Sequence, residues 1–321
     1  MKLGVLTVPL SEMSLEEALK YLSSLGVEAV ELGSGGFPGS AHLAVREIIA
    51  DQARADEVLA LTQKYNMEIS AISAHSNPVH PDAAVAQTAK EDFENSVLVA
   101  ERLGADTVIT FSGCPGDSPG AKYPNWVVCP WPEYNLEILE YQWNEVLIPY
   151  WKEAAEFARA HSVTKIALEM HPSFSVYNTE TLLKLRAAVG DIIGANFDPS
   201  HLFWQGIDPV ASILKLGGAI HHFHAKDTKV DSRNTALNGV LDTKHYADVL
   251  NRSFVFRTVG YGHGRDVWAD MISALKAVGY DGALSIEHED GLMSVREGLE
   301  KAVAFLRDVI IKETAGAMWW A

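Results

Sequence analysis

Four residues that can bind a metal ion each stand at the end of a short apolar segment. The segments read KIALE, IIGANFD, AIHHFH and GALSIE, and the residues are Glu169, Asp198, His224 and Glu287. Charged side chains at the ends of buried strands are uncommon, and four of them on separate strands indicate one shared ligand. An oxygen-rich set with one imidazole suits a divalent ion better than a thiolate-seeking one. We expect Mn²⁺ first, with Mg²⁺, Co²⁺ or Zn²⁺ as alternatives.

Other polar residues follow the same segments closely and are candidates for binding a substrate. His171 comes two residues after Glu169, and His201 comes three residues after Asp198. The alternation of side chains along a strand puts His222 on the face of His224 but one layer deeper, in a supporting or core position. His201 could be a ligand or could donate to a substrate oxygen. A buried structural role is the alternative for His75 and for any one of the four candidate ligands. The candidate substrate-binding residues are His75, His171, His201, Lys226, Arg257 and His263.

Apolar runs and helical segments alternate along the whole chain. Most of the runs are continuous rather than alternating, which is typical of strands buried on both faces in a parallel sheet. The eight predicted strands are 3–8, 27–32, 67–73, 106–111, 165–169, 192–198, 219–224 and 282–287.

Helical spacing of apolar residues separates these strands. Ser14 and Glu17 form a capping-box pattern, and Leu-Gly or Val-Gly pairs end four of the helices. Eight strand–helix units predict a single-domain (β/α)8 TIM barrel spanning residues 1–321. The rival is a doubly wound open sheet, but no glycine-rich dinucleotide fingerprint follows the first strand.

Two connections are too long for plain turns. They are residues 112–135, after strand four, and residues 225–265, after strand seven. In a barrel both would lie on the face formed by the carboxyl ends of the strands, where active sites are built. We expect walls or a lid over a small-molecule site, and the alternative is a surface excursion or an oligomer contact.

The charge and cysteine content exclude several classes of function. The formal net charge is −16, which argues against nucleic acid and anionic membranes as partners. The chain has two cysteines, Cys114 and Cys129, which we expect to be free thiols in a reducing cytoplasm. The sequence shows neither a signal-peptide pattern nor an apolar run long enough for a transmembrane helix.

Several stretches resemble the sugar isomerase/epimerase superfamily, the xylose-isomerase-like TIM barrels that include ketose 3-epimerases, inosose dehydratases and endonuclease-IV-type nucleases. The stretches are LEMHPSF, NFDPSHLFWQGIDP, HFHAKDT and GYDGALSIEHED. The resemblance covers essentially the whole chain and is strongest from about 165 to 290. It implies a TIM barrel that acts on a carbohydrate with a divalent metal ion.

The resemblance also implies roles for particular residues. In the ketose 3-epimerases the ion is held at positions that match Glu169, Asp198, His224 and Glu287, and the two glutamates act as the acid/base pair. The position of His201 binds substrate in those enzymes. This chain departs from them at HAKDTKVD, which lacks their glutamate-asparagine-arginine run, and in its long 112–135 loop. The missing run argues against a free ketohexose as the substrate, and the long loop offers the room that a glycoside needs.

The chemistry expected of such a site is removal of a proton from the carbon next to a carbonyl. A divalent ion stabilises the enediolate, one glutamate takes the proton and the other returns it. Return of the proton gives epimerisation or isomerisation, which is our leading hypothesis. Loss of a neighbouring leaving group gives a lyase, either a dehydratase of the inosose type or an enzyme that eliminates from a 3-keto-glycoside. Two further hypotheses are a nuclease, which the charge opposes, and a non-catalytic binding protein.

The sequence ends in GAMWWA, with two adjacent tryptophans. Exposed tryptophans are poorly solvated, so we expect them to dock on this subunit or on a partner. This favours a homo-oligomer.

Overall fold

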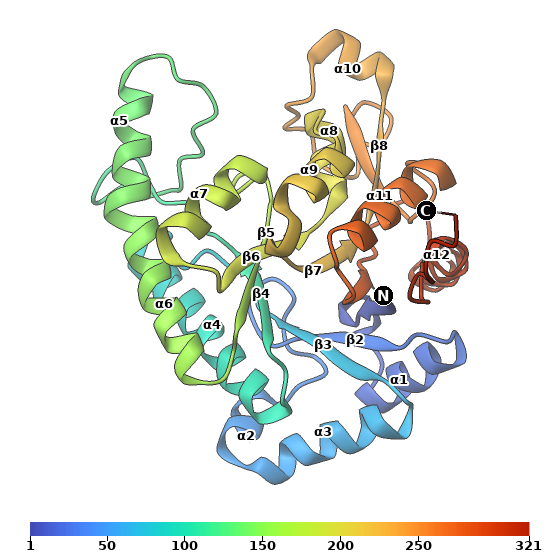
Figure 1. Ribbon diagram of the computed structural model, residues 1–321. Helices are drawn as coiled ribbons and strands as arrows, with labels where there is room; N and C mark the ends of the chain where they lie inside the picture. The colour runs from blue at the N-terminus through green and yellow to red at the C-terminus, as the bar shows by residue number, and fades with distance from the viewer. Residues whose placement is uncertain (321) are drawn as a thin grey trace.

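Eight parallel strands form a closed barrel in the computed structural model, which describes residues 1–320 (Figure 1). The order around the barrel is β1-β10-β7-β6-β5-β4-β3-β2, so β10 pairs with β1 and closes the sheet. The predicted TIM barrel is confirmed, and the open doubly wound sheet is excluded. Each predicted strand overlaps an observed one: β1 Lys2–Leu6, β2 Ala29–Gly33, β3 Glu68–Ser73, β4 Thr107–Phe111, β5 Lys165–Glu169, β6 Ile193–Phe197, β7 Ile220–Ala225 and β10 Ala283–Ile286.

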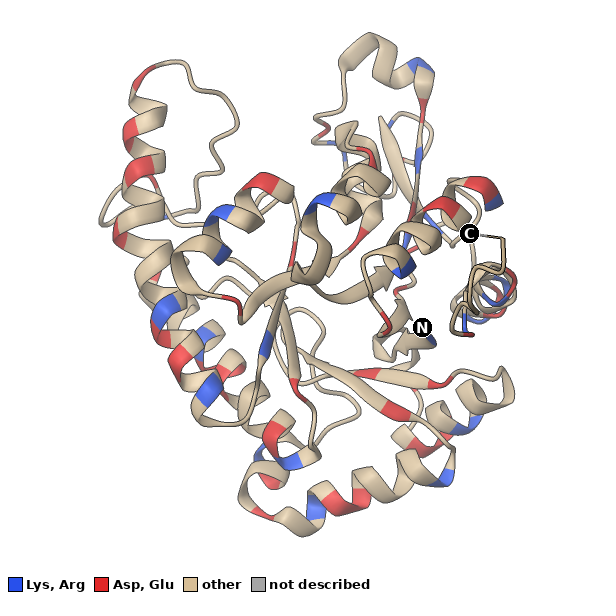
Figure 2. Ribbon diagram, viewed as in Figure 1, with Lys and Arg blue, Asp and Glu red and all other residues tan. Residues whose placement is uncertain are grey.

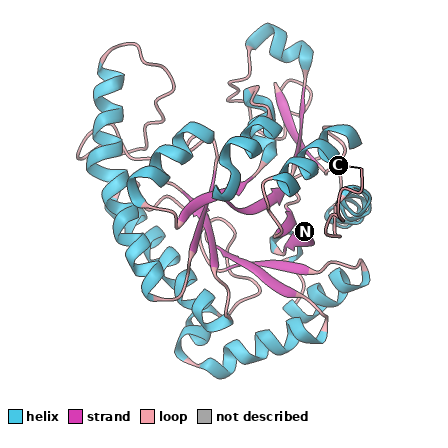
Figure 3. Cartoon of the chain, in the orientation of Figure 1, coloured by secondary structure: helices cyan, strands magenta, loops and turns pink. Residues whose placement is uncertain are grey.

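Helices surround the strands on the outside of the barrel (Figure 3). Short 3₁₀ turns cover Val8–Leu10 and Gly217–Ala219, and a π-helical segment, Tyr141–Leu147, joins α5 to α6. The α-helices are α1 Leu15–Ser24, α2 Val45–Ala50, α3 Gln52–Lys64, α4 Ala83–Leu103, α5 Tyr134–Glu140, α6 Ile148–Ala160, α7 Thr179–Val189, α8 Pro199–Gln205, α9 Pro209–Leu216, α10 Ser232–Asn238, α11 Arg265–Ala277 and α12 Val295–Val309.

Local capping explains where several helices begin and end. The Ser14 hydroxyl accepts a hydrogen bond from the Glu17 amide, and the Glu17 carboxylate accepts one from the Ser14 amide. The predicted capping box is therefore present at the start of α1. Gly104 ends α4 in the left-handed conformation, with φ of 68°. Such signals satisfy the free backbone groups at helix ends and return the chain to the barrel.

Two insertions extend the barrel at the carboxyl ends of its strands. The first is the stretch between β4 and α5. The second contains a two-stranded antiparallel sheet, β8 (Asp227–Val230) and β9 (Phe254–Arg257), with α10 between its strands. In Figure 1 the loop beside α5 and the segment carrying α10 rise at the same end of the molecule.

The surface carries mixed charge, and lysines and arginines are interspersed with acidic residues along the outer helices (Figure 2). Both cysteines are free thiols, Cys114 buried and Cys129 exposed. Burial raises the pKa of the Cys114 thiol to about 12. Within residues 1–320, no helix combines the length and the apolar character needed to cross a bilayer.

The barrel interior is layered. Ala71, Ile109 and Ala167 form a small buried cluster inside it, separate from the main core that packs the strands against the helices. Polar side chains lie above this cluster, toward the carboxyl ends of the strands. Strand register aligns them, because Glu169 pairs with Asn196, and Asn196 pairs with His222.

Gly194 in β6 lies so close to the start of β7 that no residue with a Cβ atom fits there. A Cβ atom there would lie 2.5 Å from the Ala219 carbonyl oxygen and 2.3 Å from the His221 ring. We therefore expect Gly194→Ala to lower the free energy of unfolding by about 1–3 kcal/mol in urea denaturation, the usual cost of overpacking. Gly218→Ala is the control, because its Cβ would meet no heavy atom within 4 Å. Equal stabilities for the two variants would contradict this account of the barrel wall.

Candidate metal and substrate site

The four predicted ligands converge at the mouth of the barrel. Glu169 ends β5, Asp198 follows β6, His224 lies near the end of β7 and Glu287 follows β10. One ligand atom from each of the four lies within 4.8 Å of the others. The Nδ1 atom of His224 is 3.2 Å from Glu169 Oε2 and 3.1 Å from Glu287 Oε2. Residues distant in sequence thus form one compact donor set.

This donor set fits a divalent cation. The Oδ2 atom of Asp198 and the Nε2 atom of His201 are buried, and neither makes a hydrogen bond of good geometry although they lie 3.2 Å apart. Both atoms lie within ion-pair distance of other charged groups, but buried polar atoms without a well-formed hydrogen bond are rare in native proteins and call for an explanation. Three carboxylates and one imidazole match the ligands of Mn²⁺, Mg²⁺ or Zn²⁺ sites.

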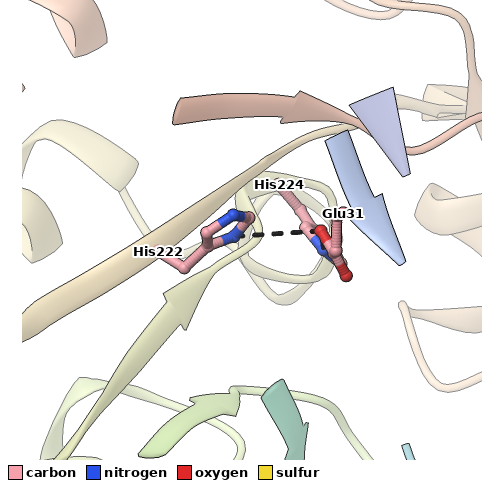
Figure 4. Close-up of side chains that lie close together, drawn as sticks. All are labelled: Glu31, His222 and His224. Carbon is pink, nitrogen blue, oxygen red and sulfur yellow. Dashed lines mark hydrogen bonds and ion pairs between the residues drawn. The ribbon is translucent and has the colours of Figure 1, made fainter. Parts of the chain in front are cut away.

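A fifth residue, Glu31 of β2, belongs to the same network. Its Oε2 atom lies 2.9 Å from His224 Nε2 and accepts a hydrogen bond from Ser285, and its Oε1 atom accepts one from Ser73. Figure 4 shows Glu31 beside His224. The Nδ1 atom of His222 lies 4.0 Å from Glu31 Oε2. Because Nε2 of His224 is bonded to Glu31, its Nδ1 atom faces the donor set.

Glu31 is a residue that the sequence pattern did not single out. A signal was present, because VEAVEL places a glutamate in an otherwise apolar strand end. Glu31 lies on the second strand of the barrel, whereas the four candidate ligands end or follow its last four strands.

A supporting polar layer lies below the ligands. The Asn196 amide donates to Glu169 Oε2 at 3.0 Å, and its oxygen lies 3.1 Å from His222 Nδ1. The other ring nitrogen of His222 lies 3.3 Å from the Ser70 hydroxyl. His222 therefore lies one layer deeper than His224, where strand alternation predicts it. These contacts fix the orientation of Glu169.

The buried ammonium group of Lys226 lies inside the carboxylate cluster. Its Nζ atom is 3.2 Å from Asp198 Oδ2, 2.8 Å from Glu287 Oε2 and 3.1 Å from Glu289 Oε2. The nitrogen also lies 4.9 Å from the centre of the Phe256 ring. Lys226 therefore neutralises two members of the donor set and presents its charge to the cavity beside them.

Three of the candidate histidines also lie at the cluster. His75 Nε2 is 3.0 Å from Glu169 Oε2, and His201 Nε2 is 3.2 Å from Glu169 Oε1. The ring of His171 lies 4.0 Å from the ring of His201, centre to centre. His75 and His171 line a small cavity together with Glu169, Glu287 and Lys226.

The structure does not bring Arg257 and His263 into the cluster. Arg257 donates to Asp290 Oδ2 at 3.0 Å. His263 bonds Asp227 at 2.8 Å and stacks on Phe203 at 3.7 Å. Asp227 also accepts hydrogen bonds from the amides of Gly260, Gly262 and His263, so these contacts hold the segment that leads into α11.

The carboxylates of the site are held in the charged form. Burial opposes ionisation of Asp198 and Glu287, but the nearby Lys226 ammonium outweighs it and lowers the pKa of each to about 2. Burial likewise disfavours the charged form of Glu31, but His224 lowers its pKa to about 2. Burial also opposes ionisation of Glu169, but the adjacent rings of His201, His224 and His75 hold its pKa well below the usual value. All four are therefore anionic at neutral pH.

The cations of the site are held in the protonated form. Burial disfavours protonated His201, but the Asp198 carboxylate raises its pKa to about 9. Glu31 and Glu287 raise the pKa of His224 well above its usual value against the same burial cost. Desolvation and repulsion by His201 instead lower the pKa of His171 to about 3, which leaves that ring neutral. Without a metal ion, the cluster thus balances carboxylates with protonated groups.

Comparison with known proteins places the chain in a family. Residues 19–309 match the family of xylose isomerase-like TIM barrels. The chain belongs to this family. The resemblance drawn from its motifs is therefore confirmed. The uncharacterised protein YfiH of Bacillus subtilis is 38% identical over 97% of this chain and 99% of its own length.

Solved structures share the fold over nearly the whole chain. A probable 3-DHS dehydratase, AsbF of Bacillus anthracis, is 18% identical with a TM-score of 0.66, over 96% of this chain and 99% of that protein. The IolI protein with a bound zinc atom is 19% identical with a TM-score of 0.65, over 97% and 98% of the two chains. At these identities the likeness is one of fold.

Replacing Glu31 tests its role as the partner of His224. We expect Glu31→Gln to weaken Mn²⁺ binding about 10–100-fold, because the carboxylate that orients the imidazole and raises its basicity is lost. Isothermal titration calorimetry would measure the change, with Glu68→Gln on the exposed start of β3 as the control. Unchanged affinity in Glu31→Gln would remove Glu31 from the site.

The protonation of His224 predicts how metal binding depends on pH. The pKa of His224 is raised, so the ring carries a proton at pH 7 that an incoming ion must displace. We expect proton release on Mn²⁺ binding. The affinity should increase with pH until the pH exceeds the raised pKa of His224. Calorimetry at pH 7 in buffers of different ionisation enthalpy would detect this release, and His221→Gln on the outer face should retain it. Identical heats in all buffers would contradict the prediction.

Proposed function

We propose that this protein is a divalent-metal-dependent sugar or keto-sugar isomerase/epimerase, with Glu169 and Glu287 as the acid/base pair. The observation that carries the proposal is the convergence of four ligand atoms within 4.8 Å at the barrel mouth. Mn²⁺ is the ion we favour, and the zinc atom bound in the IolI structure supports a metal site in this fold. A bound ion would supply the positive charge that polarises a substrate carbonyl.

The two glutamates approach one small cavity from different strands. Both line a cavity of about 160 Å³, and both lie close to His224 Nδ1. Their lowered pKa values keep them ionised, which is the form that accepts a proton, but also weaken them as bases, so proton removal from carbon requires the carbonyl to be polarised by a bound ion. A proton for the return step is available next to each carboxylate: His201 lies 3.2 Å from Glu169 and Lys226 lies 2.8 Å from Glu287. This arrangement supports proton transfer on both sides of a bound substrate.

The surrounding residues keep the reacting region dry and positioned. Glu169 is 2% exposed and His224 is fully buried, so their charges act in a medium with little screening. His75 and Asn196 hold the Glu169 carboxylate through its Oε2 atom, which leaves Oε1 toward His201. We assign substrate contacts to His75, His171, His201 and Lys226 on this basis.

A lyase is the second candidate. In that reaction a group on the carbon next to the enediolate departs instead of a proton returning. Lys226 and His201 are protonated and could donate to such a leaving group. The likeness in fold to a probable dehydratase supports this reading.

We also propose that the protein works as a homo-oligomer. Trp319 and Trp320 are 88% and 70% exposed on the isolated chain, which is costly unless another surface covers them.

Deuterium uptake tests the proposed chemistry. We expect Mn²⁺-loaded protein in D₂O to exchange a carbon-bound proton of a member of a panel of ketoses, inososes and 3-keto-glycosides, and EDTA to abolish exchange. Glu169→Gln and Glu287→Gln should each lower the rate about 10²–10⁴-fold, the usual contribution of a general acid or base. Glu145→Gln, on the exposed face of the π-helical segment, is the matched control.

The same experiment separates the candidates by product mass. An isomer or epimer keeps the mass of the substrate apart from deuterium, whereas an elimination loses water or an aglycone. Full exchange by either glutamine variant at normal metal content would refute the acid/base assignment.

A further inference from the structure

A much larger cavity lies directly outside the small one. The inner cavity has a volume of about 160 Å³, and the outer one has a volume of about 950 Å³. The two are continuous, because the same four residues line both: Phe37, Phe111, His171 and Glu289. A substrate held at the carboxylates therefore has a defined place for a bulky substituent.

Aromatic rings form two separate parts of the outer wall. In one part, Phe111 and Phe174 stack at 4.2 Å with their planes 19° apart. In the other, Tyr246 and Phe256 stack at 5.7 Å and 23°. Within each pair the two rings cover each other's inner faces, so a flat, apolar ligand would stack on the outer face of a pair.

The apolar character of this wall has no explanation within the chain itself. Phe37 is 76% exposed, Tyr246 is 57% exposed and Leu292 is 58% exposed, although all three line the same cavity. Contiguous exposed apolar surface on a soluble protein usually marks a binding site. Its continuity with the catalytic cavity points to the substrate as the occupant.

The charges near the cavity exclude an anionic substituent. Among the described residues that line the two cavities, Lys226 is the one lysine or arginine, and its ammonium is shared by Asp198, Glu287 and Glu289. Glu289 and Asp290 line the outer cavity and already bind Lys226 and Arg257, so neither of these cations is free to bind a phosphate or carboxylate. Recognition of a sugar phosphate requires unpaired cations that these walls lack.

We propose that the outer cavity binds a planar aromatic group attached to the sugar, so that the substrate class is an aryl keto-glycoside, whose ketone supplies the carbonyl that the proposed function requires, rather than a free or phosphorylated sugar. This inference rests on the proposed function, because it places the sugar at the acid/base pair. The polyol enters the inner cavity, where the carboxylates, histidines and Lys226 bind its oxygens. The aromatic group displaces water from the Phe111–Phe174 and Tyr246–Phe256 pairs.

Paired glycosides test the inference without requiring turnover. The probes are 4-nitrophenyl and methyl glycosides of the same sugars (glucose, galactose, mannose and xylose), with the corresponding disaccharides, titrated into Mn²⁺-loaded protein by calorimetry. We expect the aryl member of at least one pair to bind about 10-fold or more tightly than its methyl partner, because stacking and apolar burial add to its affinity. Phe37→Ala/Tyr246→Ala should abolish that preference, and Tyr123→Ala, also exposed but outside the cavity, should retain it.

Each alternative outcome overturns the inference. Equal binding of aryl and methyl members, or no measurable aryl binding, would show that the cavity does not select an aromatic group. Tighter binding of a disaccharide would assign the cavity to a second sugar. A preference that survives Phe37→Ala/Tyr246→Ala would place the aromatic group elsewhere. If the inference fails but free sugars still exchange deuterium, the proposed function is supported without it. If aryl ligands are preferred but no sugar of the panel exchanges deuterium, the proposed function is refuted and the aromatic-binding cavity is supported.

Discussion

The structure depends on balancing charge inside a buried barrel mouth. Glu31, Asp198 and His224 are fully buried, and Glu169 and Lys226 are 2% exposed. A charge removed from water is strongly destabilising unless a partner lies within hydrogen-bonding distance. Each carboxylate of the site therefore has a protonated histidine or Lys226 within 3.2 Å. From the layer below, Asn196, Ser73 and Ser285 donate further hydrogen bonds to these carboxylates.

The register of the barrel strands brings the buried charged groups next to their partners. Parallel pairing places Glu169 level with Asn196, and His224 level with Ser285, so that donors and acceptors from distant segments meet at one height. The apolar cluster of Ala71, Ile109 and Ala167 closes the barrel beneath them. A one-residue slip of any of these strands would turn its polar side chain outward. The precision of the site is thus set by the sheet, and the residues directly after its strands, Asp198, Lys226 and Glu287, complete it.

The sequence predicted the barrel and the convergence of Glu169, Asp198, His224 and Glu287 because both depend on local patterns. Apolar runs mark strands, and a charged residue at the end of a run marks the catalytic face. The β8–β9 sheet was not predicted, since its strands pair across a long insertion and no local turn signal joins them. Arg257 and His263 stood out by residue type, but their partners Asp290 and Asp227 could be recognised only in three dimensions. The position of Lys226 within the cluster was also hidden, because spacing after His224 does not say which way a long side chain turns.

Lys226 links the stability of the site to its affinity for a cation. Its ammonium lies against Asp198 and Glu287, two of the carboxylates that would also hold a divalent ion. Opposite charge stabilises the cluster when no ion is bound, and like charge opposes an ion that enters. The affinity of the proposed metal site would therefore be the difference between two large electrostatic terms rather than the sum of four ligand bonds. A family member with an uncharged residue at this position would bind its ion more tightly and would have a less stable cluster without it.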